Sequence, residues 1–262
     1  MVADKAWRSR ESFPLTRENL VALFENEIPE IRIPGFATPA ECAGFTAAMR
    51  GGNVQTSTKS GLGYIGAAQV NYRWGGNAKQ DYFAVTPRAW ADFHAVVDRA
   101  WNPLERLMDR LRAVLGKPVE IAEEPGGGRC FAGIIRLAEK GTARHVDYAP
   151  LNMPGWGLAD IDAQIAWNLF FTAPAEGGQT TIWNRPWDAP VIPGEDPPQS
   201  YGLGDEWVAG AETWTYRPAA GDVVLFNSRN PHRVDPTLDG GQRWQIGSFV
   251  GRRPDGSLIL WS

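Results

Sequence analysis

The pattern of apolar positions changes character near the middle of the chain. In the first half, apolar residues recur every three or four positions in three stretches, which predicts amphipathic helices. From Phe131 onward they alternate or form short runs, which predicts β-strands. The helical stretches are residues 15–28 with Thr16 as the N-cap, residues 38–49 with Thr38 as the N-cap, and residues 87–115 with a break at Pro103.

The expected strands are short and separated by turns rich in Pro and Gly, such as residues 174–178 and 218–221. This spacing is typical of a sandwich, a jelly roll or a barrel. We expect one domain over residues 1–262, in which residues 1–120 give helical support and a lid segment and residues 121–262 form the β core. The strands are residues 31–33, 131–137, 144–148, 165–172, 180–183, 213–216, 222–226, 233–235, 243–250 and 258–261.

Two segments have no clear period. Residues 50–80 are rich in Gly, Ser, Thr and Asn, and they are interpreted either as an ordinary surface loop or as a lid that carries Tyr64 and Arg73. Residues 186–204 hold several prolines and glycines and form a loop long enough to have a function.

Charge and cysteine content exclude several classes of protein. The net charge of −4 and the pI near 5.5, with scattered Lys and Arg, argue against binding to nucleic acid. Only Cys42 and Cys130 are present, which indicates a reduced compartment and argues against a zinc–thiolate site. The first residues show no apolar signal region, and no apolar run approaches the roughly 18 residues that span a bilayer. We therefore expect a cytoplasmic protein.

The candidate chemistry begins at His145 and Asp147. Residues i and i+2 of a strand point to the same face, so an imidazole nitrogen and a carboxylate oxygen can converge on one ion. His232, which follows the expected strand 222–226, is the proposed third ligand. Two histidines and one carboxylate form the facial triad of non-haem Fe(II) oxygenases. Without a third ligand, His145 could equally be a core histidine and Asp147 a turn residue. The remaining histidine, His94, lies on an expected helix and is excluded from the metal site.

Arg243 follows His232 by eleven positions and lies in an alternating strand, on the face that also carries Gln245 and Gly247. A guanidinium inside a barrel requires an anion, because a lone buried charge is costly. Its planar fork suits a carboxylate. The set of His145, Asp147, His232 and Arg243 thus predicts Fe(II) beside a bound dicarboxylate.

The His-x-Asp, Asn-Pro-His and Arg set resembles the 2-oxoglutarate-dependent oxygenases. Further motifs over roughly residues 80–262, such as residues 174–178, 221–227, 241–244 and 260–262, resemble a small bacterial branch of that superfamily. That branch includes the welwitindolinone-type alkaloid halogenases and the N-acyl amino acid hydroxylases. The resemblance implies a mainly β double-stranded β-helix (jelly roll, cupin-like) with peripheral helices, Fe(II), and the co-substrates 2-oxoglutarate and O2.

The resemblance also implies a reaction. Fe(II) is held by His145, Asp147 and His232, and Arg243 holds the far carboxylate of 2-oxoglutarate. The products are succinate, CO2 and a hydroxylated sp³ carbon. The halogenases of this branch have a small residue in place of the metal carboxylate, where chloride binds. Because this chain has Asp147 there, hydroxylation is expected and halogenation is not.

The sequence indicates a small-molecule substrate, but it defines the substrate class less sharply than it defines the metal site. Family resemblance favours a free or N-substituted amino acid, with an alkaloid or a nucleoside-type natural product as the alternative. Arg136 is expected either to meet a substrate carboxylate or to form a structural ion pair. A non-catalytic β-barrel binding protein, a cupin-type enzyme without 2-oxoglutarate, and a homodimer remain open. The candidate pocket walls, which could equally be core residues, are Asn152, Trp156 and Trp167.

Overall fold

The structure is a computed structural model that describes residues 6–56, 63–189, 194 and 200–262. The described helices are α1 (Arg17–Phe24), α2 (Pro39–Arg50), α3 (Ala78–Val97), α4 (Pro103–Leu115) and α5 (Ala149–Asn152), with 3-10 turns η1 (Gln69–Tyr72), η2 (Gly157–Ala159) and η3 (Asp205–Trp207). The chain is otherwise mostly strands, so the mainly β class expected from the sequence is confirmed.

The strands form two sheets. The major sheet has the order β1-β2-β11-β8-β13-β6-β4-β3, with β14 paired to β13 and β5 paired to β14. The minor sheet has the order β10-β9-β12-β7. The strands are β1 (Ser12–Phe13), β2 (Glu30–Ile33), β3 (Gln55–Thr56), β4 (Gly63–Ile65), β5 (Val119–Ile121), β6 (Ile134–Leu137), β7 (Thr142–His145), β8 (Ala163–Phe170), β9 (Thr180–Trp183), β10 (Thr213–Tyr216), β11 (Val223–Phe226), β12 (His232–Val234), β13 (Trp244–Arg252) and β14 (Leu258–Trp261).

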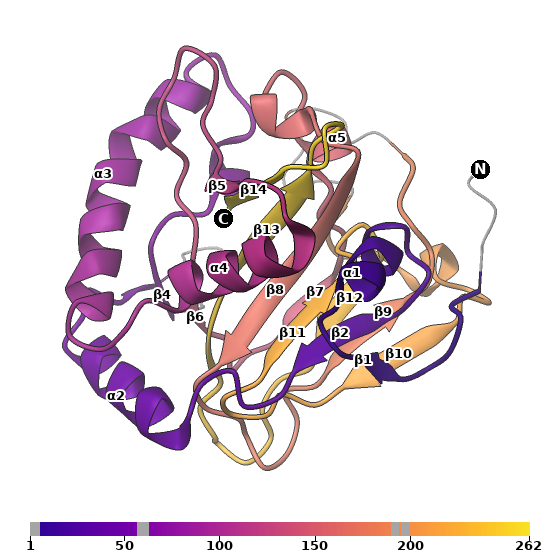
Figure 1. Cartoon of the computed structure of the whole chain (residues 1–262), viewed down its shortest axis with the longest axis horizontal. Coiled ribbons are helices and arrows are strands. Elements are labelled where there is room, and N and C mark those ends of the chain that lie inside the picture. The colour runs from indigo at the N-terminus through magenta and orange to yellow at the C-terminus, as the bar shows by residue number, and fades with distance from the viewer. Residues whose placement is uncertain (1–5, 57–62, 190–193, 195–199) are drawn as a thin grey trace.

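Successive side chains along the strands of the major sheet point to opposite faces, and each face contributes to a different hydrophobic core. One face of β8 and β11 packs against the helices through residues such as Leu169 and Leu225. The other face meets the minor sheet through Phe170 and Phe226. In Figure 1, α2, α3 and α4 gather on one side of the major sheet, and the strands of the minor sheet lie on the other. This is the jelly-roll core that the sequence predicted, with its helices on the outside.

The helices begin where the sequence places a cap. The Thr38 side chain accepts a hydrogen bond from the backbone N–H of Glu41, and the Glu41 carboxylate accepts one from the Thr38 backbone, which forms a capping box at α2. The long helical stretch 87–115 is two helices, because Asn102 caps α4 just before Pro103. The first of these helices also begins earlier than predicted, at Ala78.

The segment that carries the candidate ligands is shorter than the strand expected over residues 144–148. Strand β7 ends at His145, and Asp147 lies just past its end. Strand β12 begins at His232, which pairs directly with His145 in the antiparallel register. The fold therefore brings two distant histidines side by side at one end of the minor sheet.

The remaining expectations concern the cysteines, membrane spans and the aperiodic segments. Cys42 and Cys130 are both buried and free. Among the described residues, no helix is long and apolar enough to cross a membrane. Parts of the two aperiodic segments, residues 57–62, 190–193 and 195–199, lie outside the described residues.

Candidate metal and co-substrate site

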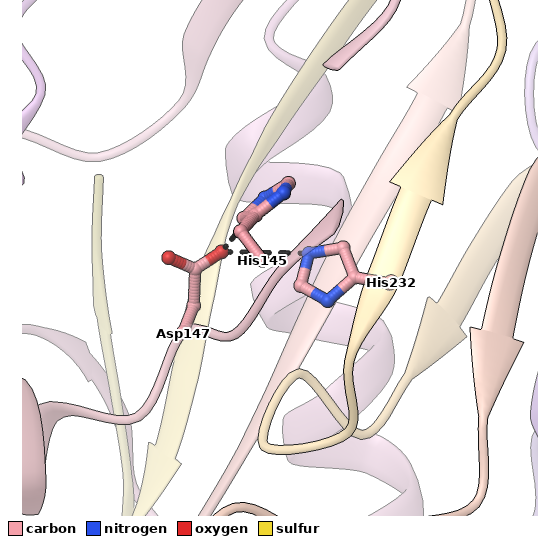
Figure 2. A group of neighbouring side chains, drawn as sticks. All are labelled: His145, Asp147 and His232. Atoms are coloured by element: carbon pink, nitrogen blue, oxygen red, sulfur yellow. Dashed lines mark ion pairs between the residues drawn. The ribbon is translucent and has the colours of Figure 1, made fainter. Parts of the chain in front are cut away.

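His145, Asp147 and His232 form one cluster, in which one potential ligand atom from each residue lies within 4.8 Å of the others. The Asp147 Oδ2 atom is 3.5 Å from the Nε2 atom of His145 and 3.5 Å from the Nε2 atom of His232. Figure 2 shows the carboxylate pointing towards both imidazoles. The three residues predicted from the sequence as a ligand set are thus brought together.

The other nitrogen of each imidazole is fixed by the backbone. The His145 Nδ1 atom is 2.7 Å from the Ala143 carbonyl oxygen, and the His232 Nδ1 atom is 2.9 Å from the Asn230 carbonyl oxygen. Because a carbonyl oxygen only accepts hydrogen bonds, each Nδ1 atom carries the proton. The Nε2 lone pair of each ring is therefore free to bind a metal, as in protein sites where a second hydrogen bond sets the tautomer.

The backbone of Asp147 is also held in place. Its N–H donates to the Ser228 carbonyl oxygen over 2.9 Å. Its carbonyl oxygen accepts hydrogen bonds from the Gln164 Nε2 atom at 3.0 Å and from the Ser228 hydroxyl at 2.9 Å. These three bonds position the carboxylate although it lies outside a strand. The sequence showed no signal for Gln164 or Ser228.

The protonation of the cluster reflects two imidazoles that share one carboxylate. Burial alone would raise the pKa of Asp147, but hydrogen bonds and charge from His145 and His232 hold that pKa well below its usual range. For His145, burial alone would lower the pKa, but the hydrogen bond and the negative charge of Asp147 have a larger effect, so the pKa of His145 is raised overall. Burial and the charge of His145 lower the pKa of His232. The carboxylate is ionised and His232 is neutral, which are the forms that ligate metals.

Arg243 lies deeper between the two sheets, with 1% of its surface exposed. Its Nε atom donates to the Gly178 carbonyl oxygen at 3.1 Å, its Nη2 atom lies 3.4 Å from the Thr180 hydroxyl, and its Nη1 atom donates to Gln245. Burial lowers the pKa of Arg243 to about 10, so the guanidinium stays charged at neutral pH.

No carboxylate of a described residue balances the charge of Arg243. Among the ion pairs between described residues, none includes this guanidinium, whose carbon lies 5.0 Å from the centre of the Phe170 ring. A buried cation without an anion is costly, because its hydration is lost and nothing replaces it. The position is thus suited to an anionic ligand that reaches in from the histidine cluster.

The residues proposed as a substrate pocket are dispersed. Trp167 is fully buried on the face of β8 that packs on the helices, where its Nε1 atom donates to the Ser248 hydroxyl over 2.5 Å. Trp156 packs against Tyr82 of α3 with ring centroids 5.7 Å apart. Arg73 lies over the ring of Trp74. The structure does not bring these three residues to the histidine cluster.

Three other candidates lie nearer the cluster or the inner sheet face. Asn152 is buried, and its side-chain amide donates to the Val146 carbonyl oxygen at 3.3 Å. Arg136 and Tyr64 are directly opposite each other in the register of β6 and β4. Arg136 also lies opposite Gln245 of β13, so it shares the face of the sheet that holds Arg243.

Sequence reasoning missed one aromatic contact to the cluster. Tyr201 forms an isolated β-bridge with His145, and the two rings lie 5.4 Å apart with a tilt of 37°. Tyr201 remains 40% exposed. It belongs to the long segment 186–204, where no periodicity could have placed it beside β7.

The chemistry of the donors fits a divalent metal. Two neutral imidazoles and one carboxylate suit Fe(II) in a facial arrangement, which leaves positions for other ligands. His232 and the ionised Asp147 are already in the form that such an ion requires, and His145, whose pKa is raised, loses its added proton when the ion binds. A buried guanidinium on the inner sheet face then provides the counter-charge for a bound acid.

Comparison with known proteins finds one matching family model and several relatives of known name. A family model described as carrier-protein-independent halogenase WelO5 matches residues 21–262. Leucinostatins biosynthesis cluster protein S of Purpureocillium lilacinum is 34% identical over 156 residues, which cover 56% of this chain and 63% of that protein. An L-gamma-glutamyl-L-propargylglycine hydroxylase of Streptantibioticus cattleyicolor is 38% identical over 139 residues, covering 52% of this chain and 50% of that protein. The chain therefore spans about half to two thirds of the length of these relatives.

The fold has a counterpart among solved structures. An N-substituted L-amino acid dioxygenase of Burkholderia ambifaria, in complex with alpha-KG, superposes with a TM-score of 0.64. The match covers 94% of this chain and 90% of that one at 15% sequence identity, so it shows the fold alone. The family match extends over nearly the whole chain. The matched range includes His145, Asp147, His232 and Arg243. The chain belongs to the family of the carrier-protein-independent halogenase WelO5.

Proposed function

We propose that this protein is an Fe(II)- and 2-oxoglutarate-dependent hydroxylase of a small molecule, namely a free or N-substituted amino acid. The observation that carries the proposal is the convergence of His145, Asp147 and His232, together with a buried Arg243 that has no acidic partner among the described residues. The amino acid hydroxylase among the relatives, and the dioxygenase that shares the fold, support the same class of reaction.

Each residue has a distinct part in this proposal. His145, Asp147 and His232 hold Fe(II), and hydrogen bonds from both Nδ1 atoms to the backbone keep the rings oriented. Arg243 binds the distal carboxylate of 2-oxoglutarate, with Thr180 beside its fork. When bound, Fe(II) with 2-oxoglutarate and O2 supplies the oxidising power that hydroxylates an sp³ C–H bond and releases succinate and CO2.

The chain itself orients these groups and keeps water away from them. Phe226 packs edge-on against His232, with ring centroids 4.9 Å apart, and so places an apolar surface against this imidazole. A low-dielectric surround strengthens the attraction between Arg243 and a carboxylate. Orientation and the exclusion of water are the contributions that a protein adds to metal chemistry.

Hydroxylation is favoured over halogenation, although the family model is described by a halogenase. The Asp147 carboxylate points into the ligand cluster, where it would occupy a coordination position that a halide needs. The reaction proposed for this chain is therefore insertion of oxygen. The two buried free thiols agree with a cytoplasmic location, which we include in the proposal.

A succinate-release screen tests the proposal. The protein, loaded anaerobically with Fe(II), is mixed with 2-oxoglutarate, O2 and free or N-acylated L-amino acids, and product mass is followed in parallel. The expected result is succinate formation coupled to a product that is one oxygen atom heavier. A product that contains chlorine instead, or Fe(II) binding without any coupled turnover across the panel, contradicts the proposal.

A further inference from the structure

Arg136 differs from the other arginines near the cluster because its guanidinium has no protein partner. It forms no side-chain hydrogen bond and no ion pair within the part of the chain that the structure describes. By contrast, Arg144 pairs with Asp205 and Arg233 pairs with Asp235, each at 2.9 Å. The structure thus gives no support to the alternative that Arg136 forms a structural ion pair.

The position of Arg136 is set by two strands. It lies opposite Gln245 of β13 and opposite Tyr64 of β4, on the inner face of the major sheet. Neither neighbour accepts a hydrogen bond from Arg136: the Gln245 side-chain oxygen accepts from Arg243, and the Tyr64 hydroxyl is directed to Gln55. The Arg136 guanidinium is half-buried on this inner face, and no acceptor of a described residue forms a hydrogen bond with it.

Arg136 also interacts electrostatically with the metal cluster. Burial lowers the pKa of Arg136, and the negative charge of Asp147 is what opposes that shift. The Asp147 Oδ2 atom lies 3.5 Å from each imidazole Nε2 atom, and none of the ion pairs between described residues joins Asp147 to Arg136. The cation therefore lies near the reaction centre and is only partly compensated.

A count of charges indicates what Arg136 binds. In the proposed complex, the two carboxylates of 2-oxoglutarate are matched by the metal and by Arg243. Asp147 offsets a further part of the metal charge. One unit of positive charge remains in the site, and its carrier is Arg136. A buried cation left in that state is costly, so the completed complex calls for one more anion.

We propose that Arg136 is the anchor for a carboxylate of the primary substrate. This inference rests on the proposed function and narrows it to substrates that carry a carboxylate, such as amino acids that are free or substituted on nitrogen. The planar fork of the guanidinium binds a carboxylate through two hydrogen bonds, which fixes the orientation of the substrate as well as its position. An uncharged alkaloid would leave that group unmatched.

Paired probes test the anchor directly. L-leucine, L-isoleucine and their N-acetyl derivatives are each compared as the acid and as the carboxamide. Binding is measured anaerobically to the protein loaded with Fe(II) and 2-oxoglutarate, by calorimetry and by the change of the visible absorption band. At least one acid is expected to bind roughly 10- to 100-fold more tightly than its amide, in line with a charged hydrogen-bonded pair.

Arg136→Gln is expected to abolish that preference while leaving the amide affinity and the 2-oxoglutarate affinity unchanged. Arg136→Lys keeps the charge and is expected to retain part of the preference. Arg233→Gln is the matched control, since Arg233 adjoins His232 but is 44% exposed and already paired with Asp235. The control is expected to leave both affinities as they are.

Thermal unfolding separates an anchor from a structural role. Arg136→Gln removes a half-buried cation that has no partner among the described residues, and a cation in that state costs stability. The melting temperature of this variant is therefore expected to be unchanged or higher. A lower melting temperature for Arg136→Gln contradicts the anchor role, and so does an equal affinity for acids and amides. A loss of 2-oxoglutarate affinity in Arg136→Gln also contradicts it, because the carboxylate would then be that of the co-substrate.

The same measurements distinguish this inference from the proposed function. If the wild-type protein binds Fe(II) and 2-oxoglutarate but shows no preference for acids, only the anchor is wrong. If Fe(II) and 2-oxoglutarate do not bind together, the proposed function is wrong. The role of Arg136 as a substrate anchor is then wrong as well.

Discussion

His145 and His232 lie directly opposite each other across the antiparallel pair of β7 and β12, with ring centroids 4.2 Å apart. Directly opposed side chains on one face of a sheet are neighbours wherever they occur in the sequence. The register of a single strand pair therefore brings together two of the three proposed metal ligands. The third ligand, Asp147, joins it because the chain continues past β7 and is held by Ser228.

His232→Ala is expected to weaken Fe(II) binding by at least about 100-fold, since even partners outside the coordination shell change metal affinity by 10- to 100-fold. Bound iron is measured by colorimetric assay after gel filtration. His94→Gln is the matched control, because His94 lies on the exposed side of α3. Iron retained at wild-type levels in His232→Ala would show that the cluster is structural.

Asp147→Gly is expected to reduce coupled hydroxylation by at least about 100-fold, as expected when a charged group at a reaction centre is removed. The change also frees a coordination position and removes a negative charge. Chloride is therefore expected to shift the visible absorption band of the variant loaded with Fe(II) and 2-oxoglutarate. In the wild type, chloride is expected to have no effect. A variant as active as the wild type is incompatible with Asp147 as a ligand.

Trp167→Phe is expected to lower the free energy of unfolding by about 1–3 kcal/mol, because it removes buried volume and leaves the Ser248 hydroxyl without its partner. Affinity for 2-oxoglutarate is expected to stay the same, since this ring packs against the helices. Trp207→Phe, at a ring that is 44% exposed, is the control and should change stability by less than about 0.5 kcal/mol. Denaturant unfolding measures both. A stable Trp167→Phe variant with altered ligand affinity would instead favour a pocket wall.

Both thiols are expected to be unreactive in the folded protein. Burial raises the pKa of Cys130 to about 12 and also raises the pKa of Cys42. A raised thiol pKa means that the thiolate, which is the reactive form, is scarce at pH 8 and increases only as the pH rises further. A disulfide-exchange reagent at pH 8 should label both residues after unfolding and neither before it. Rapid labelling of the native protein would contradict their burial.

Sequence reasoning identified the candidate ligands because the signals for them are local. His145, Asp147 and His232 were found from residue type, spacing and nearby strand patterns, and Arg243 from the alternation of its strand. The same alternation placed Arg243 and Gln245 on one face, where they form a hydrogen bond. The local signal could not show that Asp147 lies outside the strand, since backbone hydrogen bonds to a distant segment decide that.

Contacts between distant segments account for what the sequence could not predict. Trp167 seemed a pocket wall because it lies on a strand near the metal ligands, but the side of the sheet that it faces depends on where the helices pack. Tyr201 was missed because an aperiodic loop brings it to His145. Periodicity gives the spacing of side chains within an element, and it cannot give the partner of that element.

The central claim is that an Fe(II) site on β7 and β12 cooperates with Arg243 to hold 2-oxoglutarate. Anaerobic titration of the Fe(II)-loaded protein with 2-oxoglutarate tests it most directly, by following the weak visible metal-to-ligand band. The account predicts that the band saturates at one equivalent in the wild type and requires roughly 10- to 100-fold more 2-oxoglutarate in Arg243→Gln. A wild-type protein that develops no such band, or an Arg243→Gln variant that titrates identically, would contradict the account.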